Sequence, residues 1–308
     1  MIDWNVFVQL TVNGLTLGSL YALIALGYTM VYGILKLLNF AHGDVYMIGA
    51  FIGYGVLQAL GGPLDPSVPV ALLIVAMFAV AMLGAGGLGV AIERFAYRPL
   101  RNAPRIAPLI SALGVSFFLQ NSALLLFSAN FRSYETFSLI DPIKGIHEGV
   151  LNISLVRILV IVTAVALMVL LTFLVRRTQL GKAMRATSFD REAAAMMGID
   201  VDRVIVATFF ISSALAGAAG VMSGLLFSQV YHFMGFTAGL KGFTAAVVGG
   251  IGSIPGAMFG GILIGLAEAY SAGYLSSVYQ DLIVFSILIA FMLARPTGLF
   301  GARALQKV

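Results

Sequence analysis

A few ionisable and polar side chains interrupt long apolar stretches of this sequence. Asn39, His42 and Asp44 form the densest group, and Lys241 and Glu268 are the base and the acid that lie well inside late apolar stretches. Polar side chains cost free energy in lipid, so they face protein or water and often mark a transport path. These residues therefore have either a structural role or a role in lining or gating a path, and they form no enzyme site.

The group at Asn39–Asp44 permits two interpretations. Asn or Asp there caps the next helix by accepting from its free N–H groups, or the group lines or gates a path. His42 titrates near neutral pH when its environment allows, but a lone histidine is more often a fixed hydrogen-bonding residue. Lys241 and Glu268 would lower each other's burial cost if they paired, and the sequence does not show whether they touch.

Residues 247–256 contain five helix-breaking residues in ten. They predict an interrupted backbone near a membrane face, whose carbonyls and amides line a path, or a tight turn between two helices. Most other glycines in the apolar stretches indicate close helix packing. The candidates for a translocation path are Asn39, His42, Asp44, Lys241, Gly249, Gly250 and Glu268.

The sequence lacks the motifs of the common enzyme classes. It has no cysteine, no H-E-x-x-H, no G-x-S-x-G and no phosphate-binding loop, since the Gly181-Lys182 pair has Arg176 and Ala183 where that loop needs Gly and Ser or Thr. The chain is therefore not expected to be an enzyme, and no cofactor is expected on it. If ATP drives the protein, another subunit binds it.

The segment 181–200 is too polar to span a membrane and rich in helix-forming residues. Ser188 or Asp190 caps a short helix over 192–197, and Gly198 ends it. Such a helix either lies on lipid or docks in a groove of a partner, where small alanines allow close approach. The candidate contact residues are Lys182, Arg185, Arg191, Glu192, Ala193, Ala194 and Gly198.

The composition decides which elements position these residues. Of the 308 residues 60% are hydrophobic and 10% are charged, against about 45–50% and about 25% in globular domains. This excludes a secreted domain, a nucleic-acid-binding domain and a typical cytosolic enzyme. We expect an all-α, multi-pass membrane protein of about 8–10 helices, forming one domain over residues 1–308. The predicted spans are Val6–Leu35, Val45–Leu60, Val70–Ile92, Ile106–Phe127, Leu155–Val175, Val204–Val230, Phe236–Ile251, Gly256–Leu275 and Leu282–Ala294.

Two of these spans are unusual. The first is long enough for one tilted helix or a bent pair, and the seventh is short, rich in Gly and Thr, and either broken or re-entrant. With alternating spans, fourteen of the 18 Lys and Arg residues fall on one side. That side is therefore cytoplasmic and includes the C-terminus, whereas the 131–154 loop is external.

Several motifs together carry a family resemblance. The E-A-A…G pattern of Glu192 to Gly198 is similar to the loop of ABC-importer permeases that contacts the ATP-binding subunit. N-G-L-T-L-G-S-L-Y-A-L (13–23), N-F-A-H-G-D (39–44), E-R-x-A-Y-R-P-L-R (93–101), F-T-A-A-V-V-G-G-I-G-S-I-P-G-A (243–257) and R-P-T-G-L-F-G (295–301) resemble LivH-type permeases of branched-chain amino acid ABC importers.

The resemblance implies a fold like that of vitamin B12-type permeases, in a bacterial inner membrane, with a cytoplasmic coupling loop at about 176–203. It also implies two ATP-binding subunits that hold ATP and Mg, a periplasmic binding protein and a second permease, in a heterodimer or a homodimer. Relatives that carry urea, amides or other amino acids leave the substrate open. The competing hypothesis is a stand-alone secondary transporter or channel with His42, Asp44 and Glu268 as ion-coupling sites. The 181–200 segment discriminates between the two, because a secondary carrier needs no ATPase contact.

Overall fold

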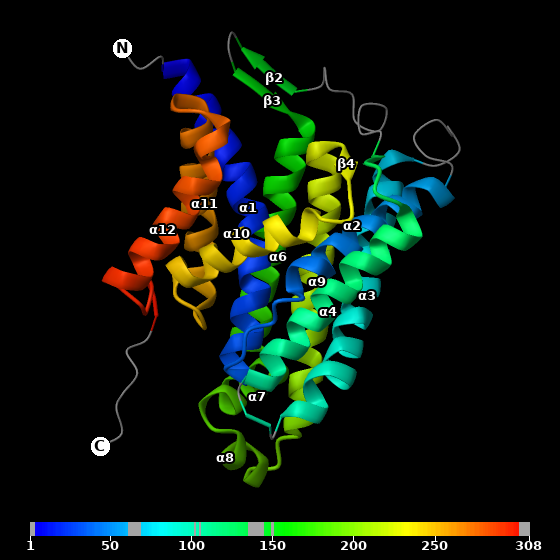
Figure 1. Cartoon of the computed structure of the whole chain (residues 1–308), viewed down its shortest axis with the longest axis vertical. Helices are drawn as coiled ribbons and strands as arrows, with labels where there is room; N and C mark the ends of the chain where they lie inside the picture. The colour runs from blue at the N-terminus through cyan, green and yellow to red at the C-terminus, as the bar shows by residue number, and fades with distance from the viewer. Residues whose placement is uncertain are drawn as a thin grey trace.

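The computed structural model describes residues 4–60, 69–101, 103–104, 106–134, 145–148 and 151–301, and helices account for most of them (Figure 1). The α-helices are α1 (Trp4–Leu35), α2 (His42–Ala59), α3 (Val70–Ile92), α4 (Ile106–Phe127), α6 (Leu155–Arg177), α7 (Gln179–Phe189), α8 (Arg191–Met196), α9 (Val201–Phe227), α10 (Met234–Gly249), α11 (Ile254–Tyr274) and α12 (Gln280–Ala294). A π-helical turn, η2 (Glu93–Tyr97), and two 3₁₀ turns, η3 (Arg98–Leu100) and η4 (Ser277–Tyr279), complete the helical part.

Two short antiparallel strand pairs connect the helices. β1 (Arg132–Ser133) pairs with β4 (Gln229–Val230), and β2 (Gly145–Glu148) forms a hairpin with β3 (Leu151–Ser154). The first pair ties the segment after α4 to the segment after α9. Neither pair forms a core, so the all-α prediction is confirmed.

Each of the nine predicted apolar stretches forms a helix. Within the described residues, seven helices are long and apolar enough to cross a membrane: α1, α3 with its η2 and η3 extension, α4, α6, α9, α11 and α12 with η4. The two others are α2 and α10, with 18 and 16 residues. The first stretch is one long helix rather than a bent pair, and the seventh is a continuous helix rather than a broken one.

Helix α1 is the central helix, and glycines let α11 pack directly on its backbone. A Cβ atom added at Gly14 would lie 2.8 Å from Leu266 Cα, and one at Gly18 would lie 2.8 Å from Ile262 Cα. Gly265 of α11 faces the Gly18 backbone in return. These short distances confirm the predicted role of the glycines in close helix packing. Close approach matters in a membrane because lipid supplies no hydrophobic force to hold helices together.

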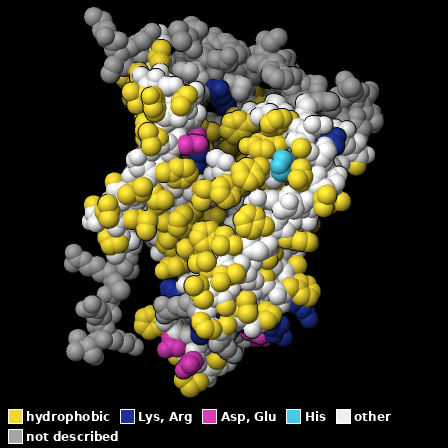
Figure 2. Space-filling view, in the orientation of Figure 1, with side chains coloured by type: hydrophobic (Ala, Val, Ile, Leu, Met, Phe, Trp, Pro, Cys, Tyr) yellow, Lys and Arg dark blue, Asp and Glu magenta, His cyan; other side chains and the backbone are white. Residues whose placement is uncertain are grey.

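Helix α10 runs across α1 at mid-height of the molecule (Figure 1) and also touches α2. Gly43 makes the second contact possible, since a Cβ there would lie 2.7 Å from Gly239 Cα. The core contains many buried residues of α1, α2, α9 and α10, and further ones of α3, α4, α6 and α11. The outer helices expose large apolar side chains, among them Leu125 in α4, Phe173 in α6 and Leu293 in α12. Figure 2 shows that such side chains cover much of the visible flank, as expected of a surface that meets lipid.

The two ends of the molecule differ. The segment α7–α8 lies at one end and the β2–β3 hairpin at the other (Figure 1). This agrees with the predicted placement of the 181–200 segment and the 145–154 residues on opposite sides of the membrane. Among the fourteen basic residues counted for the cytoplasmic side, Arg105, Arg303 and Lys307 lie outside the described residues, as does Lys144 of the 131–154 loop.

Candidate functional site

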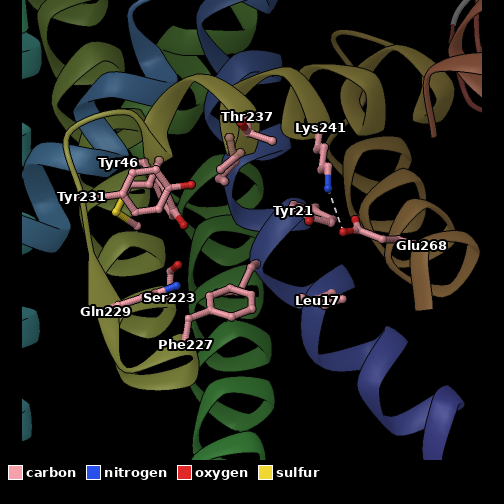
Figure 3. A pocket seen from close by; sticks show the side chains of 14 residues that line it. Leu17, Tyr21, Tyr46, Ser223, Phe227, Gln229, Tyr231, Thr237, Lys241 and Glu268 are labelled. Carbon is pink, nitrogen blue, oxygen red and sulfur yellow. Dashed lines mark hydrogen bonds and ion pairs between the residues drawn. The ribbon is translucent and has the colours of Figure 1, made fainter. Parts of the chain in front are cut away.

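A cavity of about 210 Å³ lies beneath α10, between α1, α2, α9 and α11. Figure 3 shows Lys241, Glu268 and Tyr21 toward one end of the cavity and Tyr46, Ser223, Gln229 and Tyr231 toward the other, with Thr237 of α10 between them. Leu17 and Phe227 add apolar surface to the cavity. The cavity combines apolar walls with a few polar groups, as binding sites for small molecules do.

Lys241 is the buried cation of this cavity. Its Nζ lies 2.7 Å from Oε1 of Glu268 and 2.7 Å from Oδ1 of Asp281. Lys241 and Glu268 are 6% and 5% exposed, whereas the Asp281 side chain is 56% exposed. The ion pair that the sequence suggested for Lys241 and Glu268 is therefore present. Sequence reasoning missed Asp281, which stands in the first turn of α12 and reads there as an ordinary helix-start acid.

The Asn39–Asp44 group lies at the start of α2, buried beside α1, η2 and α4. The Tyr97 hydroxyl donates to Asn39 Oδ1 at 3.3 Å, and Gln120 Nε2 donates to Asp44 Oδ1 at 3.0 Å. The His42 ring packs edge-on against Tyr28, with ring centroids 4.9 Å apart. The structure brings these three residues together, but they are not among the residues that line the cavity beneath α10.

Gly249 and Gly250 end α10, and Gly250 has a φ of +106°. The backbone of the C-terminal segment covers them: Leu299 N donates to Val248 O at 2.9 Å, and Phe300 N donates to Gly249 O at 3.0 Å. Ser253 then caps α11 by accepting from Gly256 N at 3.2 Å. Residues 250–253 thus form a tight turn between α10 and α11, and the R-P-T-G-L-F-G motif packs on it.

The segment α7–α8 is helical, as predicted. Asp190, one of the two predicted caps, accepts from the backbone N–H groups of Glu192 and Ala193 at 2.9 and 3.0 Å. Gly198 follows the helix with a φ of +81°. A left-handed residue after the last turn is a common helix stop, and glycine adopts it at no steric cost.

Two arginines of this segment bind the ends of membrane helices. Arg191 donates to Ile34 O in the last turn of α1, at 2.6 Å from Nη2, and Arg185 donates to Val175 O near the end of α6. Cations are favourable at helix C-termini, where carbonyls lack helical partners. Burial and the charge of Arg101 lower the pKa of Arg191 below its usual value. Both arginines thus fix α7–α8 to the membrane part. The sequence analysis had named them as candidates for a contact with a partner.

The small residues of α8 are also turned partly inward. Ala194 is 4% exposed and Ala193 is half-buried. The exposed tip instead carries Phe189, Met196 and Met197, which are 94%, 82% and 83% exposed. Sequence reasoning missed these three, although large apolar side chains in an otherwise polar segment are a usable signal for a contact surface. Lys182 and Glu192 of the same segment are also exposed.

The comparisons with known proteins identify the family. A family model described as "Branched-chain amino acid transport system / permease component" matches residues 10–292. This protein belongs to that permease family. It is 44% identical over 305 residues to the high-affinity branched-chain amino acid transport system permease protein BraD of Pseudomonas aeruginosa, and 45% identical over 306 residues to LivH of Salmonella typhimurium. Each alignment covers 98% of both chains.

A solved structure is a more distant match. PsaBC from Streptococcus pneumoniae in complex with Fab is 14% identical, with a TM-score of 0.42, over 95% of this permease and 91% of that chain. The fit is too loose to bear on the fold, so the likeness to vitamin B12-type permeases stays an expectation. The LivH-type resemblance of the motifs is confirmed. The protein is a multi-pass permease component of an ABC transport system, and such a system includes ATPase and further transport subunits.

A second charged cluster fixes the permease's η2–η3 turns to the start of α9. Arg98 Nη2 lies 2.5 Å from Asp202 Oδ2, and Arg101 pairs with both Asp202 and the buried Glu93. Three of these four residues belong to the E-R-x-A-Y-R-P-L-R motif, which carried the resemblance without an assigned role. Its function in the fold is to hold α3 to the segment that follows α8.

Proposed function

We propose that this permease carries the branched-chain amino acids Leu, Ile and Val into the cytoplasm as part of an ATP-driven importer in a bacterial inner membrane. The observation that supports the substrate is the 44–45% identity to the BraD and LivH permeases along 98% of both chains. The orientation follows from the basic residues: the α7–α8 end and the C-terminus face the cytoplasm.

The proposed assembly contains two ATP-binding subunits, a periplasmic substrate-binding protein and a second homologous permease, in a heterodimer or a homodimer. ATP and Mg²⁺ belong to the partner subunits. The apolar outer faces of α4, α6 and α12 supply surface for lipid and for the second permease.

The proposed contact with an ATPase subunit is the α7–α8 segment. Phe189, Met196 and Met197 would enter a groove of the ATPase, flanked by the exposed Lys182 and Glu192. Because Arg185 of α7 binds the end of α6 and Arg191 of α8 binds the end of α1, a push on the α7–α8 segment reaches two membrane helices. A rigid connection of this kind suits mechanical coupling to ATP hydrolysis.

For the translocation path we retain all the predicted residues and divide them by position. Lys241 and Glu268 line the cavity beneath α10. Asn39, His42 and Asp44 lie in the adjoining buried group, and Gly249 and Gly250 lie in the α10–α11 turn. Cysteines placed at residues 39, 42 and 44 should react with water-soluble thiol reagents in at least one nucleotide state if they border the path.

Uptake by the reconstituted importer tests the substrate. The complex, with its binding protein in proteoliposomes, should accumulate radiolabelled leucine, isoleucine and valine when ATP is supplied, and should not accumulate urea. Uptake of urea alone would favour the alternative of an amide carrier. Leucine uptake that needs an ion gradient and no ATP would favour a secondary transporter.

Co-purification tests the ATPase contact. Changing both Met196→Gln and Met197→Gln should release the ATPase or uncouple hydrolysis from uptake, because apolar area leaves the interface. Val278→Gln, which alters an 80% exposed valine in η4, is the matched control and should change neither. Normal uptake and co-purification of the double variant would place the ATPase contact elsewhere.

A further inference from the structure

A group of three charged residues lies at one end of the cavity beneath α10 and has one negative charge more than positive. Lys241 is paired with two carboxylates, those of Glu268 and Asp281, so the group as a whole carries one negative charge. Asp281 is more than half exposed and is not among the residues that line the cavity. Lys241 and Glu268 both line the cavity, and because Lys241 is shared with Asp281, the carboxylate of Glu268, which is 5% exposed, is only partly neutralised.

Glu268 also has unused hydrogen-bonding capacity. Its Oε1 accepts from Lys241, whereas Oε2 is buried and accepts no hydrogen bond of good geometry within the described part of the chain. The Tyr21 phenol interacts with the Glu268 carboxylate (Figure 3) but makes no hydrogen bond of good geometry to Oε2 and brings no positive charge. A buried carboxylate oxygen without a donor is costly, and an ammonium group supplies both the donor and the opposite charge.

The other end of the cavity has different chemistry. Tyr46, Ser223, Gln229 and Tyr231 are neutral groups with hydroxyl or amide donors (Figure 3). Hydroxyl and amide donors suit a carboxylate, which only accepts hydrogen bonds. Between the two ends, Leu17, Ile24 and Phe227 are part of an apolar wall.

We propose that this cavity binds an α-amino acid in its zwitterionic form. The ammonium group binds Oε2 of Glu268, the carboxylate binds the donors of Tyr46, Gln229 and Tyr231, and an apolar side chain packs on Leu17, Ile24 and Phe227. The proposal rests on the proposed function and adds to it that the permease itself recognises the two charged groups of its substrate, independently of a binding protein.

Equilibrium binding tests this site. The importer complex is purified without its binding protein, and radiolabelled leucine is the probe. Two competitors each lack one charged group of leucine: 3-methylbutylamine has no carboxylate, and 4-methylpentanoate has no ammonium. Wild-type complex should bind leucine, and the amine should displace it at lower concentration than the acid, because the amine keeps the group that binds Glu268.

Glu268→Gln keeps the shape of the side chain and removes its charge. It should weaken leucine binding about tenfold or more, since a hydrogen bond to a charged group contributes about 1.5–3 kcal/mol. It should also remove the advantage of the amine over the acid. Asp281→Asn is the matched control, because it breaks the other ion pair of Lys241 without altering the cavity, and it should leave leucine binding within about threefold.

Equal losses in Glu268→Gln and Asp281→Asn would show that Lys241 pairing is structural and would overturn the proposal, as would unchanged binding in Glu268→Gln. If Glu268→Gln does not assemble, Gln229→Leu at the exposed, opposite end of the cavity decides: it should weaken leucine binding and the competition by 4-methylpentanoate. Unchanged binding in that variant also overturns the site. If the wild-type importer takes up leucine but the purified complex binds no leucine, the cavity is not a leucine-binding site, whereas the proposed function stands.

Discussion

At the scale of single residues, the buried polar side chains are held by specific partners from distant parts of the chain. Asp44 accepts from Gln120, 76 positions later, and Lys241 donates to Glu268, 27 positions later. Unpaired polar groups are expensive away from water, so each of these pairs fixes two helices relative to each other. A polar residue in this permease can therefore serve the fold, the path or both, and substitution of both partners separates the roles.

Asp44→Ala tests that distinction. It leaves the buried Gln120 amide without its carboxylate partner, which should cost about 1–3 kcal/mol of stability and lower uptake while the complex still assembles. Thermal unfolding and leucine uptake are the measurements. The double variant Asp44→Ala with Gln120→Leu should recover stability but not uptake. Recovery of uptake as well would mean that the pair is structural and that Asp44 does not act in the path.

Gly265→Ala tests the contact between α1 and α11. The added Cβ would meet the Gly18 backbone, which has no flexible side chain that can move aside. We expect a loss of about 1–3 kcal/mol, seen as a lower melting temperature and a lower yield of the folded protein. The matched control is Gly87→Ala in α3, where a Cβ would have no neighbour within 4 Å. Equal stability of the two variants would contradict the backbone-to-backbone packing.

At the scale of elements, α8 is a short helix defined by its two ends. Asp190 caps its start, Gly198 ends it, and Arg191 fixes it to α1. Isolated helices of this length are unstable in water, so these contacts supply its order. An element that is held at both ends can transmit force between a partner and the membrane helices, which a flexible loop cannot.

Substitution of Gly198 tests the importance of that order. Gly198→Val places a β-branched residue at a φ of +81° and should cost about 1–2 kcal/mol or more by strain alone, because a Cβ there meets no neighbour within 4 Å. Uptake should fall relative to ATP hydrolysis. Gly198→Asn is the matched control, since asparagine tolerates the left-handed region, and it should retain most coupling. Equal coupling in both variants would show that the backbone conformation at Gly198 is unimportant.

At the scale of the whole molecule, the proposed ATPase contact and the proposed binding cavity lie in different parts of the permease. The α7–α8 end offers an exposed apolar tip, and the core holds the cavity with its charged pair. In the proposed importer, force from an ATP-binding subunit would reach the cavity through the membrane helices that α7 and α8 contact.

An ATP hydrolysis assay tests whether ATPase activity requires separate ATP-binding subunits. The purified chain alone should show no ATPase activity above an empty-membrane control, and activity should appear when the ATP-binding subunits are added. Robust hydrolysis by the isolated chain would contradict its role as a permease subunit. A contaminating ATPase is excluded by repeating the assay with a partner whose phosphate-binding lysine is replaced.

The sequence predicted more of the elements than of the site. All nine apolar stretches became helices because burial in lipid requires internal backbone hydrogen bonds, and that requirement is local. The cap at Asp190 and the stop at Gly198 were equally readable, since both depend on neighbours within a few residues. Asp281 was not readable as a partner of Lys241, because the pairing depends on how α10 and α12 approach each other.

The sequence by itself determined that lipid surrounds most of the protein, where the helices lie, and which family motifs they contain. It also determined that the 181–200 segment lies between two spans. These properties follow from composition and from interactions along one stretch of chain. Only the tertiary structure decided which side chains face each other. It turned Arg185, Arg191 and Ala194 toward the permease itself, left Phe189, Met196 and Met197 outside, and separated the Asn39–Asp44 group from the cavity of Lys241 and Glu268. The physical reason is that helix packing sets these directions, and packing depends on contacts between residues far apart in the sequence.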